Sequence, residues 1–353
     1  HLALRLDPVA ERAFPQASDL PPNGATSAGP YELTWQNAQL TSIRYAEHRI
    51  DAVPDMSILE PVAYATRRTG WRLDKMDTEP LRCDFAVLRQ VEFGPLRWRF
   101  ERWGRIEAHH VSQTLDVYHD GRIESHTSLD YLPEPRGFAL GLPCPARTSF
   151  TAGIPFGVEP RDLDRVHYFE DMSGEARGIE RLVPGMFYAR DWVQCIADRS
   201  ARALVVLDGD RYWYRPPGKD ALVHLLLHAM PPLHEGWERY AQMDRAGHMT
   251  FRHVLCLGPK AWDVAELSAI ADEDRFPIRT AYVDRETSTQ AAEWLRIEPD
   301  HIRLLSCRRI EDAIELRLVE SAGKSANVRI HTQSPITKAK LTDLLGRPLN
   351  QSP

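Results

Sequence analysis

The sequence predicts an all-β protein built from antiparallel sheets, and three observations support that prediction. Short apolar runs recur along the 353 residues and are separated by Gly, Asp and Pro, the pattern of strands joined by tight turns. Several runs alternate apolar and polar side chains, as in a sheet with one buried and one solvated face. Asp120 and Gly121 separate two such runs, and Asp-Gly at this place is a strong hairpin signal.

The first large set of expected strands lies between residues 31 and 154. In one of them Leu96, Trp98 and Phe100 alternate with arginines. The two runs on either side of Asp120 and Gly121 are expected to pair as a hairpin. The expected strands are residues 31–35, 40–45, 85–88, 96–103, 111–118 and 122–131.

The stretch from Asp191 to Leu257 is expected to complete a large sandwich. Its apolar runs at 203–207, 221–227 and 247–257 are separated by turn residues, which is typical of stacked hairpins. Residues 162–184 are polar and contain glycine, so we expect a loop lying over the sheet.

The last quarter of the chain predicts a smaller β-domain. Residues 262–278 have apolar positions at roughly helical spacing. The β pattern then resumes at residues 303–307, 313–319, 326–331 and 339–346. We therefore expect a linker or extended arm rich in Pro and Gly at 1–30, a large β-domain at 31–262 and a small one at 263–353.

Composition excludes several classes of protein. The net charge is −6 and no block of Lys or Arg occurs, which argues against a nucleic-acid partner. The sequence contains no run of 18 apolar residues, so no membrane-spanning helix is predicted. The five cysteines lie far apart and are expected to be reduced, buried thiols, which favours the cytoplasm. The chain begins at His1 without a signal peptide, so we expect it to start inside a longer protein.

A series of motifs resembles a known family. Trp192-Val193 precedes Asp198-Arg-Ser200, an apolar strand ends in Asp208-Gly209, and Asp244 to Phe251 reads Asp-x-x-Gly-His-x-x-Phe. In order and spacing these segments resemble the C-terminal β-domains of family 38 glycoside hydrolases, the retaining α-mannosidases. Further matches are Gly94-Pro95, the Pro-Phe-Gly segment that ends at Arg161, and Ile314 to Glu320. The resemblance covers residues 31–347 and departs at Arg202, where the family favours Gly, and at His228, where it often has Arg.

The resemblance implies a fold and a function, and it implies that the catalytic domain is missing from this chain. The fold would be a large antiparallel supersandwich of the galactose-mutarotase kind, followed by a smaller β-sandwich. The family holds its zinc and its nucleophilic aspartate in an N-terminal domain, where a His-x-Asp motif supplies ligands. None of His1, His48 and His119 begins such a motif, and His109-His110 is followed by Val111. We therefore expect no catalytic residue, no metal ligand and no cofactor in this chain, with zinc in the missing domain, and no hydrolysis by the chain alone.

The expected role is to support the catalytic domain and its sugar cleft. Arg161, Asp191, Trp192 and Arg199 lie in or beside the matched motifs and are the candidate substrate-binding residues at the rim of that cleft. Buried ion pairing is an equal alternative for the three charged ones. The expected partners are a mannoside, the protein's own N-terminal catalytic domain and a second copy of the chain.

Histidines and aromatic residues have simpler interpretations. His109 and His110 are expected to point to opposite faces of a strand and not to share a metal ion. Ordinary packing is expected for His224 and His228, and a hydrogen-bonded framework role for His248. Six aromatic residues can stack on sugar rings, although core packing is favoured for them: Trp98, Trp103, Trp192, Tyr212, Trp213 and Tyr214.

Two functions of other classes stay open. A stand-alone carbohydrate-binding module would require an exposed aromatic strip and no large apolar docking face. A mutarotase-like sugar epimerase would require a cleft with a histidine and a glutamate for acid–base chemistry. The candidates for that pair are His110 or His126 with Glu107, Glu124 or Glu180.

Overall fold

A computed structural model describes most of the chain as two compact units. The described residues are 17–46, 48–69, 72–145, 148–154, 157–161, 185–197, 200–206, 211–229, 246–258, 262–275, 294–343 and 345–349. The first unit reaches residue 275 and the second begins at residue 294 within this set. Each unit is described by itself.

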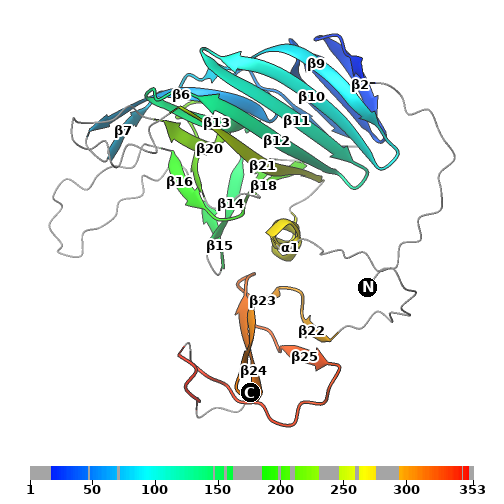
Figure 1. Ribbon diagram of the computed structural model, residues 1–353, viewed down its shortest axis with the longest axis vertical. Helices are drawn as coiled ribbons and strands as arrows, with labels where there is room; N and C mark the ends of the chain where they lie inside the picture. The colour runs from blue at the N-terminus through cyan, green and yellow to red at the C-terminus, as the bar shows by residue number, and fades with distance from the viewer. Residues whose placement is uncertain are drawn as a thin grey trace. The chain divides into compact units, whose positions relative to one another are not determined.

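The largest element of the first unit is a ten-stranded antiparallel sheet (Figure 1). Its order is β1-β9-β10-β11-β12-β21-β18-β17-β14-β15. The strands are β1 (Ser18–Asp19), β9 (Asp84–Phe93), β10 (Arg97–Ile106), β11 (His109–Tyr118), β12 (Arg122–Tyr131), β14 (Ser149–Ile154), β15 (Gly157–Arg161), β17 (Trp192–Ala197), β18 (Ser200–Val206) and β21 (Gly247–Gly258).

Two further sheets complete the first unit. A seven-stranded sheet has the order β16-β19-β20-β13-β6-β7, with β8 also paired to β6, and a four-stranded sheet has the order β2-β3-β4-β5. The strands are β2 (Gly24–Ala28), β3 (Tyr31–Gln36), β4 (Gln39–Tyr45), β5 (His48–Asp51), β6 (Glu60–Thr69), β7 (Arg72–Met76), β8 (Leu81–Arg82), β13 (Arg136–Pro143), β16 (Met186–Ala189), β19 (Arg211–Tyr214) and β20 (Ala221–Ala229).

The three sheets share one apolar core. On β11 and β12 every second side chain is buried, because successive side chains of a strand point to opposite faces. Leu115 and Ile123 from the ten-stranded sheet lie in the same cluster as Leu140 and Leu222 from the seven-stranded sheet and Leu33 from the four-stranded sheet. Along β10 to β12, the side chains that alternate with the core-facing ones point away from the core. We call the surface that they form the outward face of the ten-stranded sheet.

The seven-stranded sheet is buried on both faces, which explains its nearly continuous apolar sequence. On β13 seven of eight residues are buried. Leu140 faces the shared core, whereas its neighbour Ala139 packs in a second cluster with Tyr64, Met186 and Val223.

A single described helix, α1 (Val264–Arg275), covers part of the outward face. Leu267 and Ala271 pack against Trp192 on β17 and against Val254 and Cys256 on β21. The helix begins with a capping box: the backbone N–H of Ala265 donates to Asp263, and Glu266 accepts from the Asp263 N–H. None of the helices in the described residues has the length and apolar character that a bilayer crossing requires.

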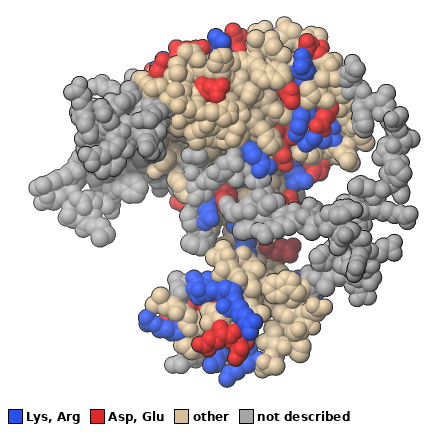
Figure 2. Space-filling view, viewed as in Figure 1, with Lys and Arg blue, Asp and Glu red and all other residues tan. Residues whose placement is uncertain are grey.

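The second unit consists of two pairs of strands. β22 (Leu295–Glu298) pairs with β25 (Arg329–Thr332), and β23 (Ile302–Ile310) pairs with β24 (Ala313–Glu320). The register of β23 and β24 gives the hairpin an apolar and a charged face. Its charged face contains the ion pairs Arg308–Glu315 and Arg317–Glu315, and basic and acidic side chains lie close together on this unit (Figure 2).

The structure confirms the predicted fold class. The Asp120-Gly121 hairpin forms with Leu115 opposite Ser125, and the expected runs at 221–227 and 247–257 are strands β20 and β21. All strand pairs in the described parts of both units are antiparallel.

Some segments differ from their sequence-based expectation. Residues 24–28, expected in a linker, form β2, which pairs in antiparallel register with β3. The last expected β segment, 339–346, contributes only an isolated bridge from Thr342 to Pro348 among its described residues. The helix predicted at 262–278 is present, and it packs on the first unit. The expected loop at 162–184 lies outside the described residues.

Candidate functional site

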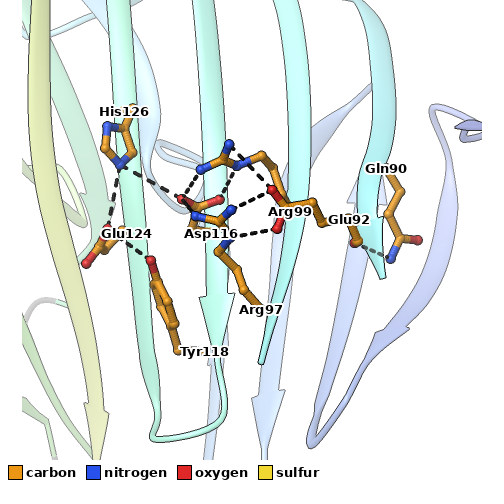
Figure 3. A network of polar contacts seen from close by, with 8 residues as sticks. All are labelled: Gln90, Glu92, Arg97, Arg99, Asp116, Tyr118, Glu124 and His126. Atoms are coloured by element: carbon orange, nitrogen blue, oxygen red, sulfur yellow. Dashed lines mark hydrogen bonds and ion pairs between the residues drawn. The ribbon is translucent and has the colours of Figure 1, made fainter. Parts of the chain in front are cut away.

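A row of charged side chains crosses four strands on the outward face of the ten-stranded sheet (Figure 3). Arg99 on β10 lies opposite Glu92 on β9 and opposite Asp116 on β11. Asp116 in turn lies opposite Glu124 on β12. The hairpin turn fixes this last pairing, so the local sequence places two carboxylates side by side.

Asp116 is the centre of the network. Its side chain is only 1% exposed although it belongs to the outward face, because the neighbouring side chains cover it. Arg99 donates to both carboxylate oxygens, from Nε at 2.6 Å and from Nη2 at 2.7 Å. Arg97 contacts the same carboxylate at 3.4 Å and forms two shorter hydrogen bonds with Glu92. Two-pronged arginine–carboxylate pairs of this kind fix geometry as well as charge.

A second part of the network joins Glu124 to a histidine and a tyrosine. His126 Nε2 lies 3.6 Å from Glu124 and 4.0 Å from Asp116. The hydroxyl of Tyr118 donates to Glu124 at 3.3 Å. Glu124 and His126 are two residues apart on one strand, so alternation alone brings them to the same face.

The network changes the pKa of several of its members. The hydrogen bond from His126 lowers the pKa of Glu124, and the hydrogen bonds from Arg97 lower the pKa of Glu92. Burial, with the nearby Glu124, raises the pKa of Tyr118. The three carboxylates and two guanidiniums leave a net charge of −1 when His126 is neutral. The site is therefore close to charge balance.

The arrangement brings together one pair that the epimerase hypothesis requires. His126 and Glu124 have the residue types for general acid–base catalysis. They lie on the outward face of a sheet, where His126 is 37% exposed. The other candidates are placed differently: Glu107 pairs with Arg136 at 2.9 Å, His110 is exposed, and Glu180 lies outside the described residues.

Asp191, one of the predicted rim residues, occupies a strained corner. Arg190 and Asp191 are the two residues that join β16 in one sheet to β17 in the other. Asp191 has a φ of 63°, and the N–H of Trp192 donates to the Arg190 carbonyl at 2.7 Å. This is a γ-turn of the strained type. A buried carboxylate held in a costly backbone conformation is a feature that occurs at functional sites.

The other three rim candidates stay predictions. Trp192 is buried against α1, so its ring belongs to the core of the first unit. Arg161 ends β15, opposite Phe150. The side chain of Arg161 and all of Arg199 lie outside the described residues.

Core packing is confirmed for four of the six candidate aromatic residues. Trp98, Trp192, Trp213 and Tyr214 are buried. Trp103 and Tyr212 are 37% and 50% exposed, and they come from β10 and β19, which belong to different sheets. The six residues therefore do not form one exposed aromatic strip.

The structure confirms that His109 and His110 point to opposite faces of their strand. His109 is buried, and its Nδ1 accepts the Leu132 N–H, whereas His110 points outward. His248 is hydrogen-bonded to Asp130 at 2.6 Å. His224 is buried, and the side chain of His228 lies outside the described residues.

Sequence reasoning missed a buried polar network around Arg102. Arg102 is in phase with Trp98 and Phe100 on its strand and points into the core. Its guanidinium donates to Gln113 and to the carbonyls of Ala38 and Leu59. Burial lowers its pKa to about 10. The period of two along β10 was the signal that could have found it.

A second missed feature is a histidine pair between the sheets. His224 on β20 and His253 on β21 are both buried, and His224 Nδ1 lies 2.9 Å from His253 Nε2. One ring nitrogen must donate and the other accept, so the contact fixes the tautomers of both rings relative to one another. The pair joins the seven-stranded sheet to the ten-stranded sheet through the core.

Comparison with known proteins gives a likeness in structure only. No family model matches the sequence, and no curated protein matches it. A protein of glycosyl hydrolase family 38 from Enterococcus faecalis aligns with a TM-score of 0.70 and 12% identity, over 96% of this chain and 43% of that one. An α-mannosidase from Enterococcus faecalis V583 aligns with a TM-score of 0.67 and 12% identity, over 95% of this chain and 41% of that one.

These alignments confirm the resemblance to family 38 structures at the level of the fold. The chain spans less than half the length of either solved structure. At 12% identity the likeness shows how the chain folds, and it does not by itself assign an activity.

Proposed function

We propose that this chain is the C-terminal β-region of an α-mannosidase-like glycoside hydrolase, and that it supports the catalytic domain and the sugar cleft of that enzyme. The observation that carries the proposal is the alignment of 96% of this chain with 43% of a family 38 structure. An alignment that covers nearly all of this chain but less than half of the other chain is expected if this chain is one region of a larger enzyme.

The second unit supports a role in domain contact. The face of its β23–β24 hairpin opposite the ion pairs carries Leu304, Ile314, Leu316 and Leu318. Ile314 is 62% exposed and Leu304 40%. Apolar side chains gathered on one exposed face are typical of a surface that binds another protein domain. We propose that the catalytic domain of the same enzyme covers this face.

The same features weigh against a stand-alone carbohydrate-binding module. Such a module requires an exposed aromatic strip, whereas four of the six candidate rings are buried. It also requires the absence of an apolar docking face, and the β23–β24 hairpin presents one.

The chemistry of the intact enzyme is proposed to lie mainly outside this chain. The zinc and the two carboxylates that a retaining glycosidase uses would belong to the N-terminal domain, because the sequence has no His-x-Asp motif at the matching positions. Arg161, Asp191, Trp192 and Arg199 are proposed to contribute to the rim of the cleft, with Asp191 the strongest of them because of its strained turn. A second copy of the chain is a further proposed partner.

A reducing compartment, the cytoplasm, is proposed for the protein. All five cysteines carry thiols and not disulfides, and four of them are buried. Burial raises the pKa of Cys83 and of Cys256 to about 12, so these thiols are unreactive.

Assays of the chain and of the longer gene product test the proposal. The chain alone should release no nitrophenol from a nitrophenyl α-mannoside, and the longer protein should release it until a chelator removes its metal. Turnover by the chain alone, or a longer protein inactive on every α-mannoside linkage, would contradict the proposal.

A substitution in the longer protein tests the rim. Asp191→Gly should keep or slightly raise the stability, because glycine adopts positive φ without strain, and should lower kcat/KM by about tenfold or more through lost substrate contact. Glu107→Gly is the matched control, since Glu107 is a second carboxylate residue with positive φ and lies in the turn between β10 and β11, whereas Arg190 pairs with Asp191 itself. An unchanged kcat/KM in Asp191→Gly would assign Asp191 a structural role only.

A further inference from the structure

We propose that Asp116, Glu124 and His126 form a binding site for one divalent transition-metal ion of the Zn2+ or Co2+ kind, distinct from the zinc assigned above to another domain. Each side chain offers one ligand atom, and the three atoms lie within 4.8 Å of one another. The inference does not rest on the proposed function.

The distances fit a tetrahedral ion after small side-chain movements. Zinc binds imidazole nitrogen and carboxylate oxygen at about 2.0–2.2 Å, so its ligand atoms stand about 3.4 Å apart. His126 Nε2 lies 3.6 Å from Glu124 and 4.0 Å from Asp116. These two separations exceed that value by about 0.2 and 0.6 Å. The separation of the two carboxylate ligand atoms lies within 4.8 Å, so the carboxylates must also move toward each other.

The strands hold the three ligands on one rigid surface. Glu124 and His126 are at positions i and i+2 of β12 and therefore point to the same side. Asp116 is the cross-strand partner of Glu124 on β11, and directly opposed side chains are close neighbours. A three-ligand site built on strands is more precise than one built on loops.

The surrounding side chains supply the contacts that orient metal ligands. Arg99 holds both carboxylate oxygens of Asp116, Oδ1 at 2.6 Å and Oδ2 at 2.7 Å, so a bound ion would share Oδ2 with that hydrogen bond. The Tyr118 hydroxyl orients Glu124. Such outer contacts are regular parts of metal sites, and the partly exposed His126 leaves a path for the ion and an open position for water.

Electrostatics limit the affinity without preventing binding. The carboxylates of Glu92, Asp116 and Glu124 are offset by the guanidiniums of Arg97 and Arg99 and by Arg252, which lies opposite His126 on β21 and acts electrostatically on Glu124. A divalent ion would therefore bind without a net negative charge around it, and we expect a weak site instead of a tight structural one.

Titration of the full chain with Co2+ tests the site. After treatment with a chelator and dialysis, the protein should bind one ion and give the intense visible bands of tetrahedral cobalt. His126→Asn and Glu124→Gln should each weaken binding about tenfold or more. His248→Asn removes a surface histidine that is also paired with an aspartate, and it should leave binding unchanged.

Two outcomes would overturn the proposal. One is the absence of saturable Co2+ binding, and the other is binding that both His126→Asn and Glu124→Gln retain. If the variants fold poorly, the unsubstituted chain still gives an answer. With its 14 histidines labelled for NMR, Zn2+ should shift the ring signals of one histidine, and lowering the pH should release the ion because the ligands protonate. If the same histidine signals still shift with Zn2+ in His126→Asn, the ion binds elsewhere and the site is rejected.

Discussion

Two arginines three positions apart on β10 show how the two faces of one sheet handle the same side chain. Arg102 points into the core and donates hydrogen bonds to neutral groups only, namely Gln113, Gln39 and two backbone carbonyls, while the buried Glu60 acts on it electrostatically without a hydrogen bond. Arg99 points outward and pairs with the carboxylate of Asp116. Inside, the cost of burying a charge is offset by several hydrogen bonds and by contact with the Phe85 ring at 4.2 Å. On the outward face, the positive charge of Arg99 is balanced by the carboxylate of Asp116.

The comparison indicates that the inner network joins elements of the fold. The Arg102 guanidinium contacts the turn that contains Ala38 and the entry to β6 at Leu59, and both of these residues have positive φ. Gln113 extends the network to Ser125 and Thr127 on β12. The inner arginine therefore connects three segments that are distant in sequence, whereas the outer network remains within β9 to β12.

The largest expected effect is on stability, from Arg102→Met. It removes the donors to two buried carbonyls and to Gln113 and should lower the free energy of unfolding by about 3–5 kcal/mol, measured in urea. Arg102→Lys is the matched control, since it keeps the charge and loses the planar fork. A loss below about 1 kcal/mol in Arg102→Met would show that the inner network does not join these segments.

A smaller effect is expected from Asp116→Asn. Loss of the carboxylate leaves Arg99 without its ionic partner, and the free energy of unfolding should fall by about 1–3 kcal/mol. Asp130→Asn removes an exposed carboxylate that is paired with His248 and should change stability by less than about 1 kcal/mol. Equal effects of the two substitutions would indicate that burial of Asp116 contributes nothing.

The smallest expected effects concern how stability depends on pH. The contributions of Glu124 on the outward face and of the buried Glu60 have opposite signs. The pKa of Glu124 is lowered by its hydrogen bond with His126, so its stabilisation is present above the ordinary value of 4.5 and is lost as the pH falls below it. Burial raises the pKa of Glu60, so the ionised form is disfavoured in the folded protein and stability falls as the pH rises above 4.5.

Urea unfolding between pH 3 and pH 7, compared with the unsubstituted chain, separates the two contributions. The deficit of Glu124→Gln should shrink toward acid pH, whereas any deficit of Glu60→Gln should grow there. The same pH trend in both variants would contradict the assigned directions.

Sequence reasoning predicted the class of fold and the central hairpin because the signals are local. Alternation fixes which side chains share a face, and the Asp120-Gly121 turn fixes the pairing of Asp116 with Glu124. From these two facts the outer carboxylates could have been placed together. Arg102 was missed although its position in the strand repeat is inward, because a charged side chain is ordinarily found at the surface.

Other parts of the site depend on contacts that no local pattern encodes. β9 meets β10 with two register irregularities, both beyond Glu92 and Arg99 as counted from the turn, so the pairing of the far ends of these strands does not follow from counting residues. The corner at Asp191 requires positive φ at a residue that is not glycine, and only the meeting of two sheets imposes it. The contact between His224 and His253 joins different sheets and likewise depends on the complete packing.

The ends of the ten-stranded sheet have a consequence for how copies of the protein meet. At one edge β1 adds only two residues along β9, and its Asp19 forms an ion pair with Arg89. At the other edge β15 carries Pro160, which has no N–H to donate. Short, charged or proline-bearing edges disfavour the addition of a strand from another molecule. Association of two copies is therefore expected through side-chain surfaces, and continuation of the sheet from one molecule into the next is disfavoured.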